Sequence, residues 1–324
     1  MSEFTIKKYT NADQQVWDAF VSQNTNTTFL FFRDFIEYHK HLFVDYSLMV
    51  FKKNKIIAIL PAHIHKKTVN SHQGLTYGGL ISDPKLRFQE RLSCCKIILK
   101  YLKDNAIKTL NLKFLPDAYQ IESNQSLEYI LHKIKAKCNQ VNMLSVVKPK
   151  HKKYSKDRIA GNKRGLINNL HIKEEDNLST FWNNLLIPKL KSKYHTEPVH
   201  SFEEIQLLKK RFPKNIRQFN VYQGERLIAG TTIFEHLHIA RSQYIASDEN
   251  KNKLGSLDFL HFYLLENVFK DKILFDFGSS HTEEHNDIID GLIYWKEGFG
   301  ATSTVQKCYR VKTKNYYLLD TILK

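Results

Sequence analysis

The chain has 324 residues, 42% of them hydrophobic and 12% aromatic, and a formal net charge of +16. This length suits two domains of about 150 residues better than one core, and the apolar content excludes a disordered chain. The polar N-terminus, the absence of a run of about 18 apolar residues and four scattered cysteines predict a cytoplasmic protein without signal peptide, membrane span or disulfide framework.

The N-terminal half predicts one mixed unit of helices and strands, because apolar residues recur with the helical period in some segments and in short β-branched runs in others. A loop at 70–84 carries Gly74, Gly78 and Gly79, a conspicuous cluster in a chain with only 12 glycines. We expect helices at 12–22, 29–42, 87–104 and 124–136, and strands at 43–51, 55–65, 107–114 and 141–147.

Between Lys148 and Lys173 the composition changes, with nine Lys or Arg residues against one acid, Asp157. We expect this stretch to be part loop and part helix and to mark the domain boundary, which gives domains at 1–150 and 151–324. Such a basic segment favours anionic partners, although a solvated lysine-rich surface would look the same.

The C-terminal half predicts helices at 178–192 and 201–211, then two strands that meet at a Gly-Glu-Arg turn. A loop at Leu254-Gly255-Ser256 opens a long helix, a buried strand ends at Asp276-Phe277-Gly278-Ser279-Ser280, and a helix and a last strand follow. An acyl-transfer site on a split sheet needs this order, because a helix start beside a splayed strand offers free N–H groups to an anionic cofactor.

Four segments, taken in this order and spacing, resemble the GNAT-superfamily acyltransferases, and more narrowly the Fem-like double-GNAT proteins. They are Gln243–Ser247, Leu254–Asp258, Phe275–Ser280 and Lys296–Ala301, and a weaker likeness runs through Gly74–Gly79. The resemblance implies an α/β fold with mixed sheets, built as a tandem of two GNAT-like domains. The C-terminal domain would carry the donor site.

The expected cofactor-binding loop comprises Lys251, Lys253, Leu254, Gly255 and Ser256. The lysines supply positive charge, and the N–H groups of residues 254–257 could cap a phosphate. The GNAT pattern has a second small residue that is absent here, so an ordinary Gly-Ser helix start is the alternative interpretation. By resemblance the cofactor is acetyl-CoA or another acyl-CoA, with aminoacyl-tRNA as the alternative.

Three residues are candidates for the chemistry. Lys296 could stabilise an oxyanion, or merely complement a helix C-terminus. Asp276 ends a buried strand, where a carboxylate acts as a base or accepts N–H bonds from its loop. Tyr244 could protonate a leaving thiolate, although a buried core tyrosine is the safer interpretation.

The acceptor-binding candidates lie in both halves. Arg241 and Gln243 are two positions apart, so they lie on one face of a strand, where an arginine would bind an anion. Ser279 lies three positions after Asp276, at the end of the following strand. By resemblance, Arg33, Tyr77 and Gly78 would line the acceptor cleft in the N-terminal half.

We therefore predict an N-acyltransferase that acts on an amine of an amino sugar, amino acid or cell-envelope precursor, with a small-molecule amine or nucleotide-sugar as acceptor. The alternatives are a Fem-type enzyme that uses aminoacyl-tRNA in peptidoglycan-bridge formation, which the basic charge favours, and a non-catalytic degenerate GNAT module. No histidine pair has a third ligand in register, so no metal is expected. The oligomeric state is left open.

Overall fold

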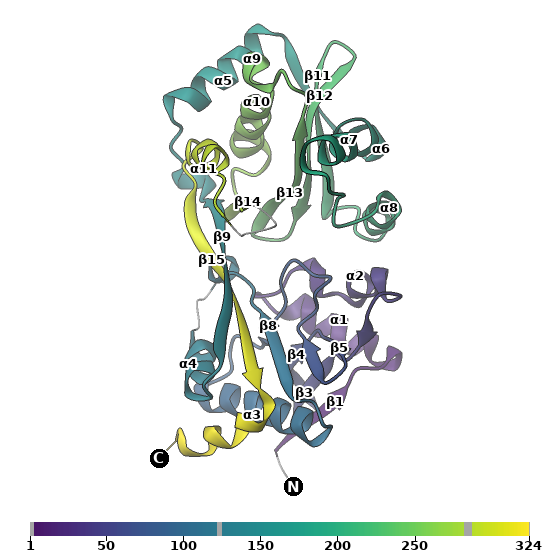
Figure 1. Cartoon of the computed structure of the whole chain (residues 1–324), viewed down its shortest axis with the longest axis vertical. Helices are drawn as coiled ribbons and strands as arrows, with labels where there is room; N and C mark the ends of the chain where they lie inside the picture. Colours follow the sequence, from purple (N-terminus) through teal and green to yellow (C-terminus); the bar gives the residue numbers. More distant parts are fainter. Residues whose placement is uncertain (1–2, 122–124, 282–286, 324) are drawn as a thin grey trace. The chain divides into compact units, whose positions relative to one another are not determined.

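The structure, a computed structural model, describes residues 3–121, 125–281 and 287–323, which form two compact units (Figure 1). Unit 1 comprises 1–142 together with 305–324, and unit 2 comprises 143–304. The domain boundary expected at residue 150 lies close to the unit boundary at 142/143. The expectation also assigned 305–324 to the second domain, whereas the structure groups these residues with unit 1. These residues cluster with unit 1 because strand β15 (Thr302–Lys312) pairs with β8 (Thr109–Lys113).

Unit 1 contains two sets of hydrogen-bonded strands. In the first, β1 (Phe4–Lys8), β3 (Leu48–Lys52), β4 (Lys55–Leu60) and β7 (Ile81–Ser82) pair in that order. The β3–β4 hairpin turns at Lys53 and Asn54, which both have positive φ, as a type I′ hairpin turn requires. In the second set, β15 and β8 continue to β6 (Thr68–Asn70), β5 (His63–His65) and β2 (Val44–Asp45).

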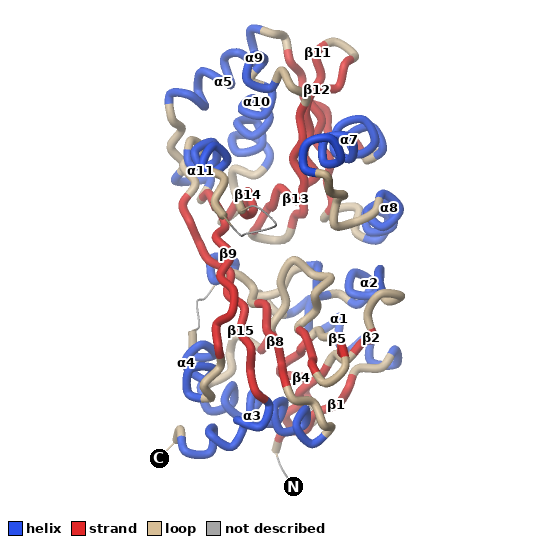
Figure 2. Tube along the Cα trace, viewed as in Figure 1, coloured by secondary structure: helices blue, strands red, loops and turns tan. Residues whose placement is uncertain are grey.

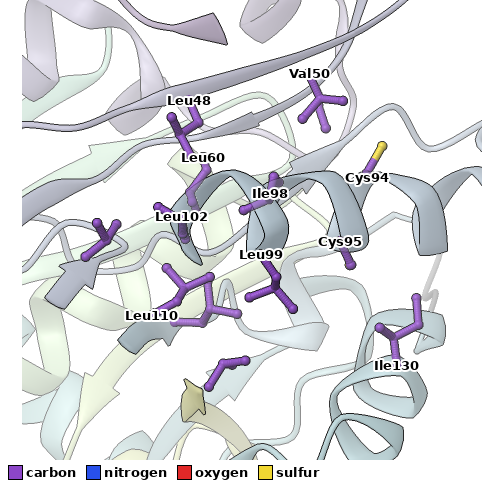
Figure 3. Close-up of a cluster of buried hydrophobic side chains, with 14 of the residues drawn as sticks. Leu48, Val50, Leu60, Cys94, Cys95, Ile98, Leu99, Leu102, Leu110 and Ile130 are labelled. Atoms are coloured by element: carbon purple, nitrogen blue, oxygen red, sulfur yellow. The ribbon is translucent and has the colours of Figure 1, made fainter. Parts of the chain in front are cut away.

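Helices α1 (Gln14–Gln23), α3 (Phe88–Asp104) and α4 (Ser126–Lys133) confirm three of the predicted helices of unit 1. The buried face of α3 packs into an aliphatic core with Leu48, Leu60 and Leu110 (Figure 3). The predicted helix at 29–42 is wrong. Two 3-10 turns, Phe29–Phe31 and Glu37–His39, flank the short α2 (Arg33–Ile36), because Phe32 is extended and the apolar residues before it are buried on all sides.

Unit 2 is built on one sheet with helices on both faces (Figure 2). Its strands pair antiparallel except for the neighbours β13 and β14, which run parallel. The pairing order is β10 (Leu170–Glu175), β11 (Ile216–Gln223), β12 (Arg226–Glu235), β13 (Ile239–Ser247), β14 (Leu274–Ser279) and β9 (Lys137–Val147), whose first half belongs to unit 1.

One face of this sheet is covered by α9 (Lys251–Leu254) and α10 (Ser256–Tyr263), with α5 (Lys156–Ile167) packed beside α10 (Figure 1). A π-helical turn, Leu264–Val268, extends α10. The other face carries α8 (Phe202–Arg211) and a continuous helical stretch made of α6 (Ser179–Phe181), a π turn (Trp182–Leu186), α7 (Ile187–Lys189) and a second π turn (Leu190–Tyr194). Helix α11 (Asp290–Glu297) precedes β15. Within the described ranges, no helix is both long and apolar enough to cross a membrane.

Candidate functional site

The neighbouring strands β13 and β14 frame the candidate site. Their parallel pairing covers Ile239–Arg241 and Leu274–Asp276. Immediately afterwards β13 bulges, since Ser242 and Tyr244 pair with consecutive residues of β12 and leave Gln243 as the extra residue. A bulge bends a strand and re-aims its side chains. Beyond this point residues of both strands line a cavity of about 580 Å³.

The cavity lies wholly within unit 2 and is large enough for a small ligand. Its wall combines apolar side chains with a few cationic ones, as ligand sites commonly do. The lining residues come from β13 (Ser242, Gln243, Ile245, Ala246, Ser247), β14 (Phe277, Ser279), α11 and its approach (Ile289, Gly291, Leu292, Tyr294, Trp295, Lys296), α9 and α10 (Lys251, Asn252, Leu257, Asp258), α5 (Arg158) and the stretch 186–193 (Leu186, Lys189, Leu190, Lys193).

Lys296 is the most unusual residue of this wall, because its side chain is charged and only 2% of the residue is exposed. Its ammonium donates hydrogen bonds to the carbonyl oxygens of Gly278 (3.1 Å) and Ser279 (2.6 Å). Burial lowers the pKa of Lys296 to about 8, partly opposed by nearby Asp276 and reinforced by Arg241. An ammonium has three donors, so among the described residues one hydrogen remains for a group in the cavity.

Asp276 lies behind this wall and does not line the cavity. Its fully buried carboxylate pairs with the guanidinium of Arg241 and accepts the N–H of Gly278 at 2.6 Å. Arg241 in turn donates to the side-chain oxygen of Gln243 at 3.1 Å. The arrangement corresponds to the carboxylate that accepts N–H bonds from its own loop, and it holds the strand end that presents two carbonyls to Lys296.

Tyr244 points away from the cavity, into a buried pair with His200. Its hydroxyl lies 2.5 Å from Nδ1 of His200 and accepts the backbone N–H of the same residue at 3.2 Å. Burial raises the pKa of Tyr244 well above its ordinary value. A hydroxyl held in this way cannot reach a leaving group in the cavity, so the geometry matches the core interpretation.

The expected cofactor loop is divided by the structure. Lys251 lines the cavity and Lys253 is exposed, whereas Leu254, Gly255 and Ser256 are buried. Helix α5 covers the start of α10 so closely that a Cβ added to Gly255 would lie 2.1 Å from the carbonyl oxygen of Gly161. Among the N–H groups predicted to cap a phosphate, those of Leu254 and Gly255 already donate to the carbonyls of Asn250 and Lys251, and α5 packs against this start of α10.

Further cations beside the cavity were not anticipated from the sequence. Lys189 and Lys193 project from the helical stretch, where a spacing of four places them on one face. Lys189 donates to the carbonyl oxygen of Ser247, and its pKa is lowered by burial and by the charges of Lys251 and Lys193. The i, i+4 spacing of these lysines could have predicted a shared helix face, but it could not predict that this face lines a cavity.

The α5 side of the wall carries an ion pair that sequence reasoning also missed. Arg158 pairs with Asp258, and the same carboxylate accepts the indole N–H of Trp295 at 2.8 Å. A Cβ on Gly161 would lie 1.7 Å from this carboxylate. The glycine therefore permits the close approach of α5 and α10 that sets the pair in place.

The acceptor candidates Arg33, Tyr77 and Gly78 belong to unit 1. Arg33 is buried, bonds to Glu37 and Asp45, and lines a separate cavity of about 230 Å³ in that unit. Tyr77 is buried with its hydroxyl donating to a threonine, and Gly78 packs against a backbone carbonyl. Within 3–121, 125–281 and 287–323, no group of three His, Cys, Asp or Glu side chains is placed to hold a metal ion.

No protein-family model and no curated protein matches this sequence. Among solved structures, FemX matches with 10% identity over 97% of this chain and 99% of that chain, at a TM-score of 0.67. The chain has the Fem-like, double-GNAT fold. This confirms the expected α/β class and the tandem of two GNAT-like units.

Two further solved structures share this fold. The C-terminal domain of a putative lysylphosphatidylglycerol synthetase from Agrobacterium fabrum matches with 9% identity over 95% of this chain and 93% of that chain, at a TM-score of 0.61. L-PGS from Bacillus licheniformis matches with 11% identity over 81% and 85%, at 0.53. At these identities the likeness concerns the fold, and the function has to be argued from the site.

Proposed function

We propose that unit 2 is the centre of an acyltransferase, in which the acyl carbonyl of a donor enters the cavity beside Lys296. The observation that carries this proposal is the buried ammonium of Lys296, fixed by two carbonyls and lining the cavity where β13 and β14 diverge. A preoriented cation in a site that excludes water stabilises negative charge far better than one in solvent.

The reaction is the direct attack of an amine on the acyl carbon. A C–N bond forms, the carbonyl oxygen becomes an oxyanion, and collapse of this intermediate breaks the C–S or C–O bond to the carrier. The amine loses one proton and the carrier gains one. Lys296 would donate a hydrogen bond to the oxyanion, and its pKa of about 8 suits proton donation to the leaving group near neutral pH.

The donor in this proposal is carried on a phosphate-bearing molecule, because Lys189, Lys193 and Lys251 gather along one part of the cavity wall. An acyl-CoA would place its phosphates on these lysines. It would not use the start of α10, which α5 covers.

Aminoacyl-tRNA is the second candidate donor, and the covered start of α10 favours it, since a tRNA end needs basic side chains and no helix terminus for its phosphates. The +16 charge points the same way. The acceptor in either case is the amine of an amino sugar, amino acid or cell-envelope precursor.

The test compares labelled acyl transfer to a panel of such amines from acetyl-CoA, longer acyl-CoAs and charged tRNA. Lys296→Met should lower kcat by about 10²–10³, the usual loss for one oxyanion donor, whereas Lys214→Met, an exposed lysine of unit 2 away from the cavity, should not. Equal rates for Lys296→Met and the wild type would overturn the proposed role of Lys296. Tight donor binding without transfer to any amine would instead indicate a binding module.

Lys189→Ala and Lys251→Ala identify the donor end of the cavity. Each should raise the KM for the donor with little change in kcat, because a phosphate contact is made equally in the ground and transition states. A donor whose KM is unchanged in both variants does not bind where we propose.

A further inference from the structure

Helix α5 presents two very different faces. Its inner face packs on α10 through Gly161 and Gly165 and sends Arg158 to the cavity wall. Its outer face consists of Lys156, Ile159, Ala160, Lys163, Leu166 and Ile167, all exposed, and we call this set the outer face of α5. Their spacing follows the helical period, so they form one continuous stripe along the helix. Helix α5 itself lies at the edge of unit 2 (Figure 1).

This stripe is inverted relative to an ordinary surface helix, which turns its polar residues to water. Ile159, Leu166 and Ile167 are 40%, 59% and 78% exposed. Single exposed aliphatic residues need no explanation, but three on one face of one helix form a patch. Within the described part of unit 2, no element covers this face, because its residues remain exposed.

The patch is also strongly cationic. Lys156 and Lys163 belong to it, and Lys148, Lys150 and Lys153 are exposed in the segment that leads into the helix. Against these five lysines stands one exposed acid, Asp157, whose carboxylate accepts the hydroxyl of Tyr294 at 2.6 Å. A partner of this surface therefore has to accept aliphatic side chains and to offer negative charge around them.

We propose that the outer face of α5 docks on an anionic lipid surface. Aliphatic side chains of an interfacial helix enter the boundary between headgroups and acyl chains, while lysines along the helix meet lipid phosphates. A single-stranded RNA would be bound by lysines interleaved with aromatic stacking residues, and this face has none. The charge and the aliphatic stripe together therefore favour a membrane over RNA.

Docking in this way has a geometric consequence for the cavity of unit 2. Arg158 projects from the same helix into the cavity wall, so only the thickness of one helix, about 10 Å, separates the wall from the lipid. A reactant anchored in the membrane surface would then lie within about the thickness of one helix of the cavity wall. The docking itself does not depend on the proposed acyl transfer.

The experiment is co-sedimentation of the full chain with vesicles of equal parts phosphatidylglycerol and phosphatidylcholine, with pure phosphatidylcholine vesicles as the reference. We expect binding to the anionic vesicles alone at about 0.1 M salt, weakened at about 1 M, where the screening length falls from about 10 Å to about 3 Å. The Leu166→Ser/Ile167→Ser variant should lose at least about tenfold in affinity, since it removes the residues that enter the lipid.

Matched variants show whether a loss of vesicle binding comes from the missing aliphatic side chains, from altered charge or from damage to the fold. Val199→Ser/Leu237→Ser removes two aliphatic residues of unit 2 that are 79% and 69% exposed elsewhere, and it should bind like the wild type. Unchanged thermal midpoints of both variants establish that the fold is intact. Wild-type affinity in Leu166→Ser/Ile167→Ser overturns the proposal, because the attraction would then be electrostatic only.

The RNA alternative is tested in the same series with bulk tRNA. If the wild type ignores anionic vesicles but binds tRNA, and Lys156→Ser/Lys163→Ser loses that binding, the outer face of α5 is an RNA surface and the lipid proposal fails. The exposed lysines Lys210 and Lys214 supply the matched control, Lys210→Ser/Lys214→Ser. Vesicle binding that falls in Lys156→Ser/Lys163→Ser but not in this control supports the lipid surface.

Discussion

Replacement of Lys296 by methionine should change how the stability of the protein depends on pH, independently of any substrate. Burial lowers the pKa of Lys296 from 10.5 to about 8 in the folded state. Between these two values the unfolded chain binds more protons than the folded chain, so the wild type gains stability as the pH rises. Lys296→Met carries no proton at this position and has no such gain.

The magnitude follows from the two pKa values, which differ by about 2.5. Each pH unit of this difference corresponds to about 1.4 kcal/mol of unfolding free energy. Between pH 7.5 and pH 10 the free energy of unfolding of the wild type should rise by about 2–3 kcal/mol relative to Lys296→Met. All other groups titrate in both proteins and cancel in the difference. The absolute difference at pH 7.5 also includes the two carbonyls that lose their donor, so only its change with pH is diagnostic.

Urea unfolding followed by tryptophan fluorescence measures this difference, because Trp295 lies next to Lys296. Leu292→Met, a substitution of similar volume in the same cavity wall, is the control, and its difference from the wild type should be flat across this range. A flat profile for Lys296→Met would refute the reasoning, because it would mean that the ammonium is hydrated in the folded protein.

Three further outcomes are expected. Gly161→Ala should destabilise unit 2 by about 1–2 kcal/mol in urea unfolding, because the added Cβ meets the Asp258 carboxylate, which two partners hold in place. Gly291→Ala is the comparison in the same assay, and it should stabilise by about 0.5–1 kcal/mol because the space around this helical glycine is open. Arg241→Ala should cost about 3–5 kcal/mol in the same assay, since it removes the guanidinium that pairs with the buried carboxylate of Asp276, and a loss below about 1 kcal/mol would contradict this role of the pair. Tyr244→Phe should cost about 1–2 kcal/mol but leave kcat within about twofold, and a large fall in kcat would restore a catalytic role for the hydroxyl.

The strand and helix order of unit 2 could be predicted because each element carries its own local signal. The strands β11 to β14 are β-branched or aromatic runs that end at turn residues. Gly255 lies directly before α10 as expected, and its positive φ ends the short α9. The predicted helix at 29–42 failed for the opposite reason. Its first residues, Phe29–Phe31, are buried on all sides and Phe32 is extended, so tertiary burial determined short turns there instead.

The composition of the site could be predicted only in part, because a site depends on which distant segments meet. The sequence indicated Lys296, Gln243, Lys251 and Ser279, and all four line one cavity. It could not indicate that α5 covers Gly255, since that contact joins two glycines 94 positions apart (255 minus 161). Lys189 was missed for the same reason, as helical periodicity predicts a face but not what that face meets.

The pairing of β15 with β8 has a consequence for the order in which the chain acquires its structure. The hydroxyl of Thr313 donates to the carbonyl of Ile107, 206 residues away, and Val311 and Leu319 are buried in the core of unit 1. Closing so long a loop is slow, because the chain loses conformational entropy before any stabilising contact between its ends has formed. Unit 2 is contiguous and lies inside that loop. It is therefore able to fold during synthesis, while unit 1 keeps an incomplete core exposed to chaperones until residues 305–324 leave the ribosome.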